Sequence, residues 1–509
     1  MGNDYIEAAR VFHEITKHSY TSVRSSPHFL DWDNKPLPYK IYPGIASVAL
    51  PRDLNLSSTP TLAALSSYVP ADFSASIDTD ALTRILFCAD GLTRQKRVGD
   101  DDYHFRAAAS AGALYPIEIY VAAVDVAGLE TGLYHFSPAD LKMTGLRRGD
   151  WRSYIADAAA KRPSILRARA VIAMSAIYWR SEWKYRARAY RYCYWDAGTI
   201  LANLLAAAAA EEISAEVITA FEDPALETLL GIDTEREGMI ALVALGRTDD
   251  PATPSPAVEP LTLETIPLSS QEVAYPDLVK MHRESRLVTA DEVASVIGAK
   301  LDSPSAQSLS SASALHLETV TSEESAGLGE TILRRGSSRA FAQEAITAEE
   351  LATIMAASSE PPQADFPALT DTYLIVNAAT GLAPGAYYYN RNARAFELLK
   401  LGNFRGEGGY LCLEQPLGMD CSALIVYMAD LERALHAFGN RGYGDAHLEA
   451  GILGGRAYLA AYSLGRGATG LTFYDDDTTK FFEPHAAGKS PLLMVAVGIP
   501  RSRMKIVAA

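Results

Sequence analysis

Two short segments of this 509-residue chain carry residues whose types and spacing suit a flat, anionic ligand. In Arg335-Gly336-Ser337-Ser338-Arg339, two arginines four positions apart flank two serines. Guanidinium groups pair with phosphate oxygens as a fork, and serine hydroxyls add short hydrogen bonds. The segment therefore indicates a site for a dianionic phosphate; a solvated helix start with incidental arginines is the alternative.

The second segment is the run of small residues Ser110-Ala111-Gly112-Ala113, which continues as Leu114-Tyr115-Pro116. Small side chains let backbone amides approach a flat ligand closely. The next residues, 117–124, are rich in β-branched types and predict a strand. An ordinary turn before that strand is the alternative interpretation of the segment.

Both segments belong to a chain that contains an internal duplication. Arg188-Ala189-Tyr190 returns 253 positions later as Arg441-Gly442-Tyr443, and Asp196-Ala197-Gly198 returns at the same offset as Glu449-Ala450-Gly451. A fixed offset held over many residues indicates two copies of one domain.

The two copies differ at the segments that could do chemistry. The stretch near Ser66 to Asp72, which matches Arg335 to Phe341, has no arginine, and Gln363 to Leu369 has none of the small-residue character of Ser110 to Pro116. Each copy has therefore kept what the other lacks, which indicates one site divided between two halves.

A third difference is Lys184-Tyr185, which faces Ala437 and Phe438 in the second copy. The pair lies in a predicted helix over 179–191 that is dense in arginine, lysine and aromatic residues. A cationic, aromatic surface face of that helix is the alternative to a functional role.

The predicted fold class is α+β, with two tandem domains of mixed, mainly antiparallel sheet flanked by helices. We expect an N-terminal arm at 1–75, a first domain at 76–250, a Pro- and Ser-rich linker at 251–330 and a second domain at 331–509. A helix is predicted to start near Asp78 or Thr79, followed by a loop to about Arg106. The linker is expected to hold one helix, near 291–297.

The composition excludes several classes of function. The net charge is −16 and the pI about 5.2, which disfavours nucleic acid or an anionic membrane surface as a partner. No run of 18 apolar residues and no basic-then-apolar N-terminus is present, so we expect a soluble, unexported, cytoplasmic protein. The four cysteines have no metal-type spacing, and we predict reduced thiols and no metal site. They are Cys88, Cys193, Cys412 and Cys421.

Taken together, these residues resemble the FMN-dependent nitroreductase superfamily, and most closely its streptolysin-type and cyanobactin-type azoline dehydrogenases. The matching features are Thr16-Lys17-His18, the Ser110 to Pro116 loop, Lys184-Tyr185 ahead of Arg188 to Arg191, and Arg335 to Phe341, which fits the pattern Arg-x-Ser-x-Arg-x-Phe. The resemblance covers nearly the whole chain apart from the linker. Ala111 and Gly112 stand where many nitroreductases have an asparagine, which argues against a simple nitroaromatic reductase.

The resemblance implies a pseudo-dimer within one chain, with one intact FMN site between the halves and a mirror site that lacks both its phosphate clamp and its loop. It also leaves room for two chains to associate further. The residues implied to bind FMN are Arg335, Ser337 and Arg339 at the phosphate, with Arg501 or Arg503 as a further basic contact, Ser110, Ala111 and Gly112 along the ring or ribityl chain, and Gly470 and Leu471 at the pyrimidine side.

The implied reaction is azoline oxidation, with hydride transfer between flavin N5 and a small or peptide-borne heterocyclic substrate. Lys184 or Tyr185 would act as the base, with a pKa lowered by the arginines at 180, 186, 188 and 191. Oxygen or another acceptor would reoxidise the flavin. One alternative is an NAD(P)H-dependent reductase of nitro compounds, quinones or other small electrophiles; the other is a flavin-free scaffold or docking protein.

Overall fold

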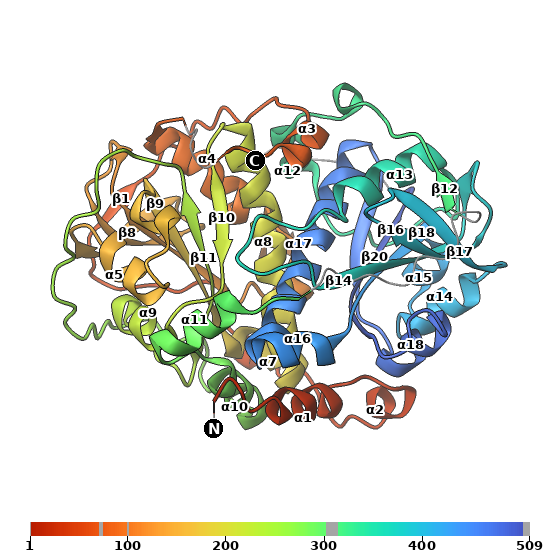
Figure 1. The fold of residues 1–509 in the computed structure, drawn as a ribbon, viewed down its shortest axis with the longest axis horizontal. Coiled ribbons are helices and arrows are strands. Elements are labelled where there is room, and N and C mark those ends of the chain that lie inside the picture. Colours follow the sequence, from red (N-terminus) through yellow and green to blue (C-terminus); the bar gives the residue numbers. More distant parts are fainter. Residues whose placement is uncertain (1, 71–74, 99–100, 302–313, 502–509) are drawn as a thin grey trace.

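The computed structural model describes residues 2–70, 75–98, 101–301 and 314–501. Two halves, each built on a seven-stranded antiparallel sheet, lie on either side of the two longest helices, α8 and α17 (Figure 1). One hydrophobic cluster runs through both halves and includes these two helices. The predicted α+β class and the internal duplication are confirmed.

The first sheet has the strand order β1-β8-β7-β5-β9-β11-β10. The elements of this part of the chain are α1 (Glu7–Ile15), α2 (Tyr20–Arg24), η1 (Trp32–Asn34), β1 (Ser47–Ala49), α3 (Thr61–Ser66), β2 (Ile77–Asp78), α4 (Thr79–Asp90), β3 (Leu92–Val98), β4 (Asp101–Arg106), η2 (Ala111–Ala113), β5 (Ile117–Ala123), β6 (Val126–Ala127), β7 (Gly132–Ser137), β8 (Lys142–Arg148), α5 (Arg152–Ala158), α6 (Pro163–Leu166), β9 (Ala170–Ile177), α7 (Tyr178–Tyr185), η3 (Arg186–Arg188), α8 (Ala189–Ala210), β10 (Ala215–Ile218), α9 (Asp223–Leu230) and β11 (Glu237–Leu245).

The second sheet repeats that order as β12-β17-β16-β14-β18-β20-β19. The remaining elements are α10 (Pro276–Ser285), α11 (Ala290–Gly298), β12 (Ala314–His316), η5 (Ser322–Glu324), α12 (Leu328–Arg334), β13 (Ile346–Thr347), α13 (Ala348–Ala357), β14 (Thr370–Val376), β15 (Ala379–Thr380), β16 (Gly385–Asn390), β17 (Ala395–Leu401), α14 (Arg405–Leu411), α15 (Pro416–Asp420), β18 (Ala423–Ala429), α16 (Leu431–Phe438), α17 (Arg441–Ser463), β19 (Gly467–Leu471), α18 (Asp475–Phe482) and β20 (Ser490–Gly498).

Helices α8 and α17 touch backbone to backbone where they cross. A Cβ added at Gly198 would lie 2.6 Å from the Cα of Gly451, and one added at Gly451 would lie 3.0 Å from the Cα of Gly198. These two glycines are 253 positions apart, so they are the same residue in the two copies. The crossing therefore lies on the pseudo-twofold axis of the chain, and any side chain there would force the halves apart.

Three buried ion pairs, centred on one aspartate in each half, tie the halves together. Arg441 of the second half pairs with Asp223 of the first, and Arg188 and Arg191 of the first half pair with Asp475 of the second, at 3.0 and 2.8 Å. All five side chains are buried. Burial raises the pKa of Asp475, but Arg188, Arg191 and the amide of His18 more than offset it, so the net pKa lies below the usual value.

The duplication extends into the segments predicted to be an arm and a linker. The backbone of His18, after α1, exchanges hydrogen bonds with Asp475, and the backbone of Leu287, after α10, does the same with Asp223. Helix α10 therefore plays the part of α1 in the other half, and its existence corrects the expectation of a linker with one helix. The predicted helix near 291–297 is confirmed as α11, which begins with a capping box at Thr289.

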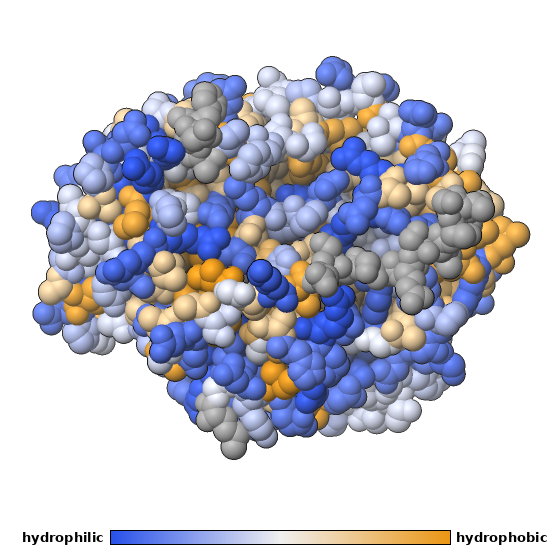
Figure 2. All heavy atoms as spheres, viewed as in Figure 1, coloured by the Kyte–Doolittle hydropathy of each residue, from blue (hydrophilic) through white to orange (hydrophobic). Residues whose placement is uncertain are grey.

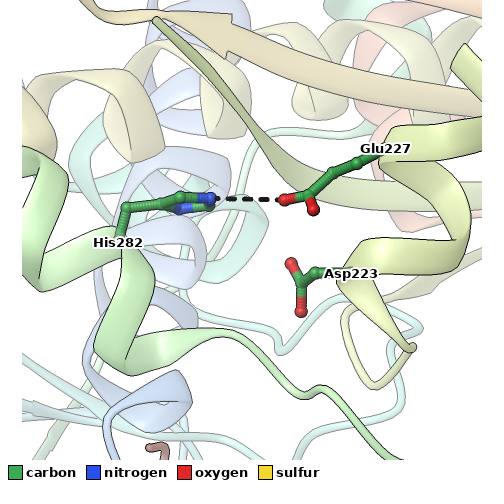
Figure 3. Close-up of side chains that lie close together, drawn as sticks. All are labelled: Asp223, Glu227 and His282. Atoms are coloured by element: carbon green, nitrogen blue, oxygen red, sulfur yellow. Dashed lines mark ion pairs between the residues drawn. The ribbon is translucent and has the colours of Figure 1, made fainter. Parts of the chain in front are cut away.

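Helix α10 also places His282 beside the carboxylates of α9. Figure 3 shows the His282 ring directed toward Glu227, at 3.8 Å, with Asp223 one turn earlier on the same helix. The ligand atoms of these three buried side chains lie within 4.8 Å of one another. Asp223 is paired with Arg441 and Glu227 with Arg286, so two guanidinium groups already supply the positive charge that a cation would bring.

Two predictions about local structure were wrong. Residues 92–98 and 101–106, which lie in a segment predicted as a loop, form the β3–β4 hairpin. The sequence did not reveal it because most of these residues are polar and show no apolar alternation. The helix predicted over 179–191 breaks at Arg186, whose φ of 53° separates α7 from α8. The helix start at Thr79, capped by Asp78, is confirmed.

In the part of the chain that the structure describes, no helix is both long and apolar enough to cross a membrane. On the face drawn in Figure 2, hydrophilic and hydrophobic residues are interspersed. The four cysteines are free and buried.

We predict that Asp475→Asn strongly destabilises the protein, because it leaves two buried guanidinium groups without their counter-charge. Removal of one partner from a buried ion pair costs about 3–5 kcal/mol of unfolding free energy. Urea unfolding measures this, with Glu235→Gln as the control because its pair with Arg283 is exposed and should contribute little.

The pH dependence of this difference has a defined sign. The pKa of Asp475 is lower in the folded protein than the value of about 3.9 for an unfolded aspartate. Its contribution is therefore complete above about pH 4 and is lost as pH falls through the folded pKa. A stability gap between wild type and Asp475→Asn that stays constant well below pH 4 would contradict the assignment.

Candidate functional site

A cavity of about 880 Å³ lies at the seam between the halves. This volume is within the range of small-molecule and cofactor sites. Apart from Arg501, its lining includes every predicted site residue that the structure describes: Ser110, Ala111, Gly112, Lys184, Tyr185, Arg335, Ser337, Arg339, Gly470 and Leu471. Arg503 lies outside the described residues.

Asp196 of α8 holds the small-residue loop against the cavity. Its carboxylate accepts hydrogen bonds from the Ser110 hydroxyl at 2.5 Å and the Ala111 amide at 2.9 Å. The Thr199 hydroxyl, one turn along the helix, donates to the carbonyl of Ala109 at 2.5 Å. Burial raises the pKa of Asp196 to about 7, although both hydrogen bonds act to lower it.

The loop has an unusual backbone, which brings it against Lys184 and Tyr185. Gly112, Ala113 and Tyr115 all have φ between 51° and 66°, a region that non-glycine residues seldom adopt. A Cβ added at Gly112 would lie 2.9 Å from the Tyr185 hydroxyl and 3.3 Å from Lys184 Nζ. The loop thus delivers backbone to the place where a lysine amine and a phenol meet.

The pKa values of these two side chains move in opposite directions. Burial lowers the pKa of Lys184, and the positive charges of Arg339 and Lys35 lower it further. Burial raises the pKa of Tyr185 well above its usual value, helped by Tyr192, whose ring lies 4.1 Å away. Of the two, Lys184 is therefore the better base near neutral pH.

The pKa of Lys184 is lowered as predicted, but the arginines predicted to lower it are not the cause. Arg180 is paired with Glu118 in the core, while Arg188 and Arg191 are paired with Asp475. Arg186 is exposed at the break between α7 and α8. The positive charges that lower the pKa of Lys184, in addition to burial, are instead those of Arg339 in the second half and Lys35 in the N-terminal arm.

Within the Arg335 to Arg339 segment, the two arginines have different surroundings. Arg335 is buried, and its Nε and Nη2 donate to the carbonyls of Arg106, Ala107 and Ala108 at 2.7–3.0 Å. It therefore braces the backbone that leads into the small-residue loop. Arg339 is exposed and lines the cavity.

The hydroxyl of Tyr458 on α17 links Ser337 of the phosphate segment to Gly470 of β19. It lies 3.2 Å from the Ser337 hydroxyl and accepts a hydrogen bond from the amide of Gly470. Gly470 and Leu471 end β19 at the cavity. Arg501, predicted as a further phosphate contact, lies 3.9 Å from Asp420 and is not among the lining residues.

Sequence reasoning missed two groups of lining residues. Tyr192, Trp195, Asp196 and Thr199 lie on one face of α8, and their spacing of three and four residues was the available signal. The other group, Arg94, Gln95, Lys96 and Phe105, comes from the β3–β4 hairpin.

The same seam recurs in the mirror position, where it is closed. At the 253-residue offset, segment 363–365 matches the loop at 110–112, and β10 with the residues after it matches the end of β19. Val217 exchanges backbone hydrogen bonds with Gln363 and Asp365, at 2.9 and 3.1 Å. The Asp365 carboxylate accepts from the amides of Thr219 and Ala220 at 2.9 and 3.0 Å. The two segments thus bond directly to each other across the mirror seam.

A model of the nitroreductase family matches residues 74–247 and 332–499, which together are more than half of the chain. A relative from Methanocaldococcus jannaschii, described as a candidate nitroreductase, is 30% identical over 174 residues, which are 34% of this chain and 83% of the relative.

A solved structure from Anabaena variabilis ATCC 29413, also described as a candidate nitroreductase, resembles the whole chain. It is 26% identical with a TM-score of 0.76, over 97% of this chain and 99% of that chain. The two proteins therefore share the arrangement in two halves. The nitroreductase-like fold predicted for both halves is confirmed.

We predict that Gly112→Ala disturbs the site more than its backbone strain explains. An alanine with φ above zero costs about 1–2 kcal/mol wherever it stands. At Gly112 the methyl group would also meet Tyr185 and Lys184, whereas Gly465, with φ of 73°, has nothing within 4 Å. Urea unfolding of Gly112→Ala and Gly465→Ala separates the two effects, and we expect the larger loss of stability in Gly112→Ala. Equal losses would show that the side chains around Gly112 accommodate the methyl group without cost.

Proposed function

The chain belongs to the nitroreductase family, and on this premise we propose that it is an FMN-dependent oxidoreductase with one flavin site built from both halves. One observation carries the proposal: residues selected in different copies, for different chemical reasons, line a single cavity. A flavin-free scaffold has no need of such a division.

The residues of the cavity suit FMN. Arg339 and Ser337 offer a guanidinium group and a hydroxyl for the phosphate, while the buried Arg335 adds positive charge behind them. Ser110 to Gly112 present backbone without bulky side chains, as a flat ring system requires. Gly470 and Leu471 approach from the opposite half. Tyr458, which bonds to both Ser337 and Gly470, would keep the phosphate end and the ring end in register.

We further propose that the reaction is a dehydrogenation of the azoline type, on a small or peptide-borne heterocycle. Bound flavin would supply the two-electron redox chemistry by accepting a hydride. Lys184, with its lowered pKa, would take the proton from the neighbouring substrate atom. Tyr185 would remain a neutral phenol and orient the substrate by hydrogen bonding, since its pKa is raised. Asp196 would position the loop and not touch the reacting atoms.

Arg339→Ala should weaken FMN binding without unfolding the site. Loss of a charge-assisted hydrogen bond costs about 1.5–3 kcal/mol, or roughly tenfold to a hundredfold in Kd. Quenching of FMN fluorescence on titration with apoprotein measures the change, and Arg501→Ala is the matched control. An unchanged Kd in Arg339→Ala would remove this residue from the phosphate site. Arg335→Ala is a poorer test because it also frees three buried carbonyls.

Lys184→Ala should retain flavin but lose turnover of a thiazoline-bearing peptide by about 10²–10⁴-fold, the usual contribution of a positioned base. Wild-type activity should rise with pH through a pKa below the ordinary lysine value, because the neutral amine is the active form, and this rise should vanish in the variant. Lys142, which is half-buried and does not line the cavity, provides the control, Lys142→Ala. Full turnover in Lys184→Ala would leave the lysine a structural role only.

Anaerobic stopped-flow reduction separates the dehydrogenase from the reductase. We expect a thiazoline peptide to bleach the bound flavin faster than NADH or NADPH does, because a dehydrogenase takes its electrons from the substrate. Rapid bleaching by NAD(P)H, with no bleaching by thiazoline, would establish the reductase of nitro compounds or quinones in its place.

A further inference from the structure

The β3–β4 hairpin is an addition that only the first copy carries. Helices α4 and α13 begin at Thr79 and Ala348, an offset of 269, whereas β5 and β14 begin at Ile117 and Thr370, an offset of 253. The first copy therefore has 16 more residues between helix and strand, and this is where the hairpin lies. The matching stretch of the second copy, 358–369, forms no strand. The hairpin therefore brings to the cavity residues that have no counterpart in the second copy.

The base of the hairpin is firmly held. Arg106, its last residue, forms a buried ion pair with Asp90 and is braced through its carbonyl by Arg335. The arm crosses the outer strand, where the Tyr39 hydroxyl lies 2.7 Å from His104 Nδ1 and Lys35 lies 4.9 Å from the centre of the Tyr103 ring. The side chains that the hairpin presents to the cavity therefore start from a fixed backbone.

Arg94 of the hairpin reaches the phosphate segment of the other half. Its guanidinium lies 4.5 Å from the centre of the Phe105 ring, and a Cβ added at Gly336 would lie 3.6 Å from its Nη1. Burial lowers the pKa of Arg94, and the charges of Arg335 and Arg339 lower it further, although it stays a cation near neutral pH. The three guanidinium groups thus repel one another, and an anion among them would relieve that repulsion.

The charge of the cavity exceeds what one flavin phosphate would neutralise. The charged residues of the described lining are the cations Arg94, Lys96, Arg335 and Arg339, together with Lys184 when its amine is protonated, and the single acid Asp196. Burial raises the pKa of Asp196 to about 7, which reduces its negative charge near neutrality. The chain as a whole carries −16. A concentration of positive charge in so acidic a protein indicates an anionic ligand in addition to the dianionic phosphate.

We propose that Arg94 and Lys96 form a second anion subsite, which binds a carboxylate or phosphate group of the molecule that exchanges electrons with the flavin. This rests on the proposed function. The anionic group belongs either to the substrate or to a nucleotide donor with an extra phosphate, and the subsite makes the hairpin the specificity element of the enzyme.

The test uses calorimetric titration of inorganic pyrophosphate into the FMN-saturated protein. We expect one pyrophosphate to bind to wild type with flavin retained, and binding at least tenfold weaker in Arg94→Gln/Lys96→Gln at equal flavin content. Arg97→Gln is the matched control, because Arg97 follows Lys96 on the same strand but does not line the cavity. Equal binding by the double variant, or equal weakening by Arg97→Gln, would overturn the subsite.

Two further arms identify the source of the anionic group. If the double variant loses affinity for NADPH but not for NADH, the subsite recognises the extra phosphate of the nucleotide. If the variant treats both nucleotides as wild type does, yet its KM rises at least tenfold for an acidic but not for a neutral thiazoline peptide, the subsite recognises a substrate carboxylate. If the double variant shows neither of these changes, the proposal is refuted.

Failure of the proposed function has a different signature. If wild type takes up no FMN at all, the flavin assignment is wrong. The pyrophosphate titrations then compare Arg339→Ala with Arg339→Ala/Arg94→Gln/Lys96→Gln, so that the exposed arginine of the phosphate segment is absent from both proteins. Equal binding by these two would overturn the subsite.

Discussion

Gly198 and Gly451 lie so close at the crossing of α8 and α17 that no side chain fits between the two helices. This contact joins the two copies of the same residue, so it fixes a pseudo-twofold axis within one chain. The reciprocal pairs of Arg441 with Asp223 and of Arg188 with Asp475 follow from that axis. So does the functional seam, because each half presents one face of α8 or α17 to the other. In a chain with one hydrophobic cluster through both halves, neither half would keep its site alone.

The pseudo-twofold arrangement gives two equivalent seams between the halves, and the residues at the two seams differ. At one seam Asp196 holds a loop of small residues back against α8, and a cavity remains between the halves. At the other, Asp365 bonds to the amides of Thr219 and Ala220 and joins the segments directly. The two copies have thus diverged so that one seam holds a cavity and the other does not hold its matching segments apart. The first half contributes a hairpin at the open seam that the second half lacks, and the second contributes the arginines.

Much of the site was visible in the sequence because it depends on residue types that differ between the copies. Arg339, Gly112 and Lys184 were identified by such differences, and the structure brings them to one cavity. The hairpin was not, since polar residues on an exposed pair of strands give no period-two apolar pattern. The double role of Arg335 was also hidden, because only the fold shows that its guanidinium meets three carbonyls. Arg180, Arg188 and Arg191 were wrongly predicted to lower the pKa of Lys184 for the same reason. Their carboxylate partners, Glu118 and Asp475, lie far away in the sequence.

The most direct test of this account is the amount of FMN bound per chain. Protein saturated with FMN and freed of excess ligand would be denatured, and the released flavin would be identified by chromatography and quantified against protein absorbance. The account predicts one FMN per chain, because one seam is open and its mirror is closed. Two FMN per chain would contradict the closed mirror seam, and none, after incubation with excess FMN, would contradict the flavin site itself.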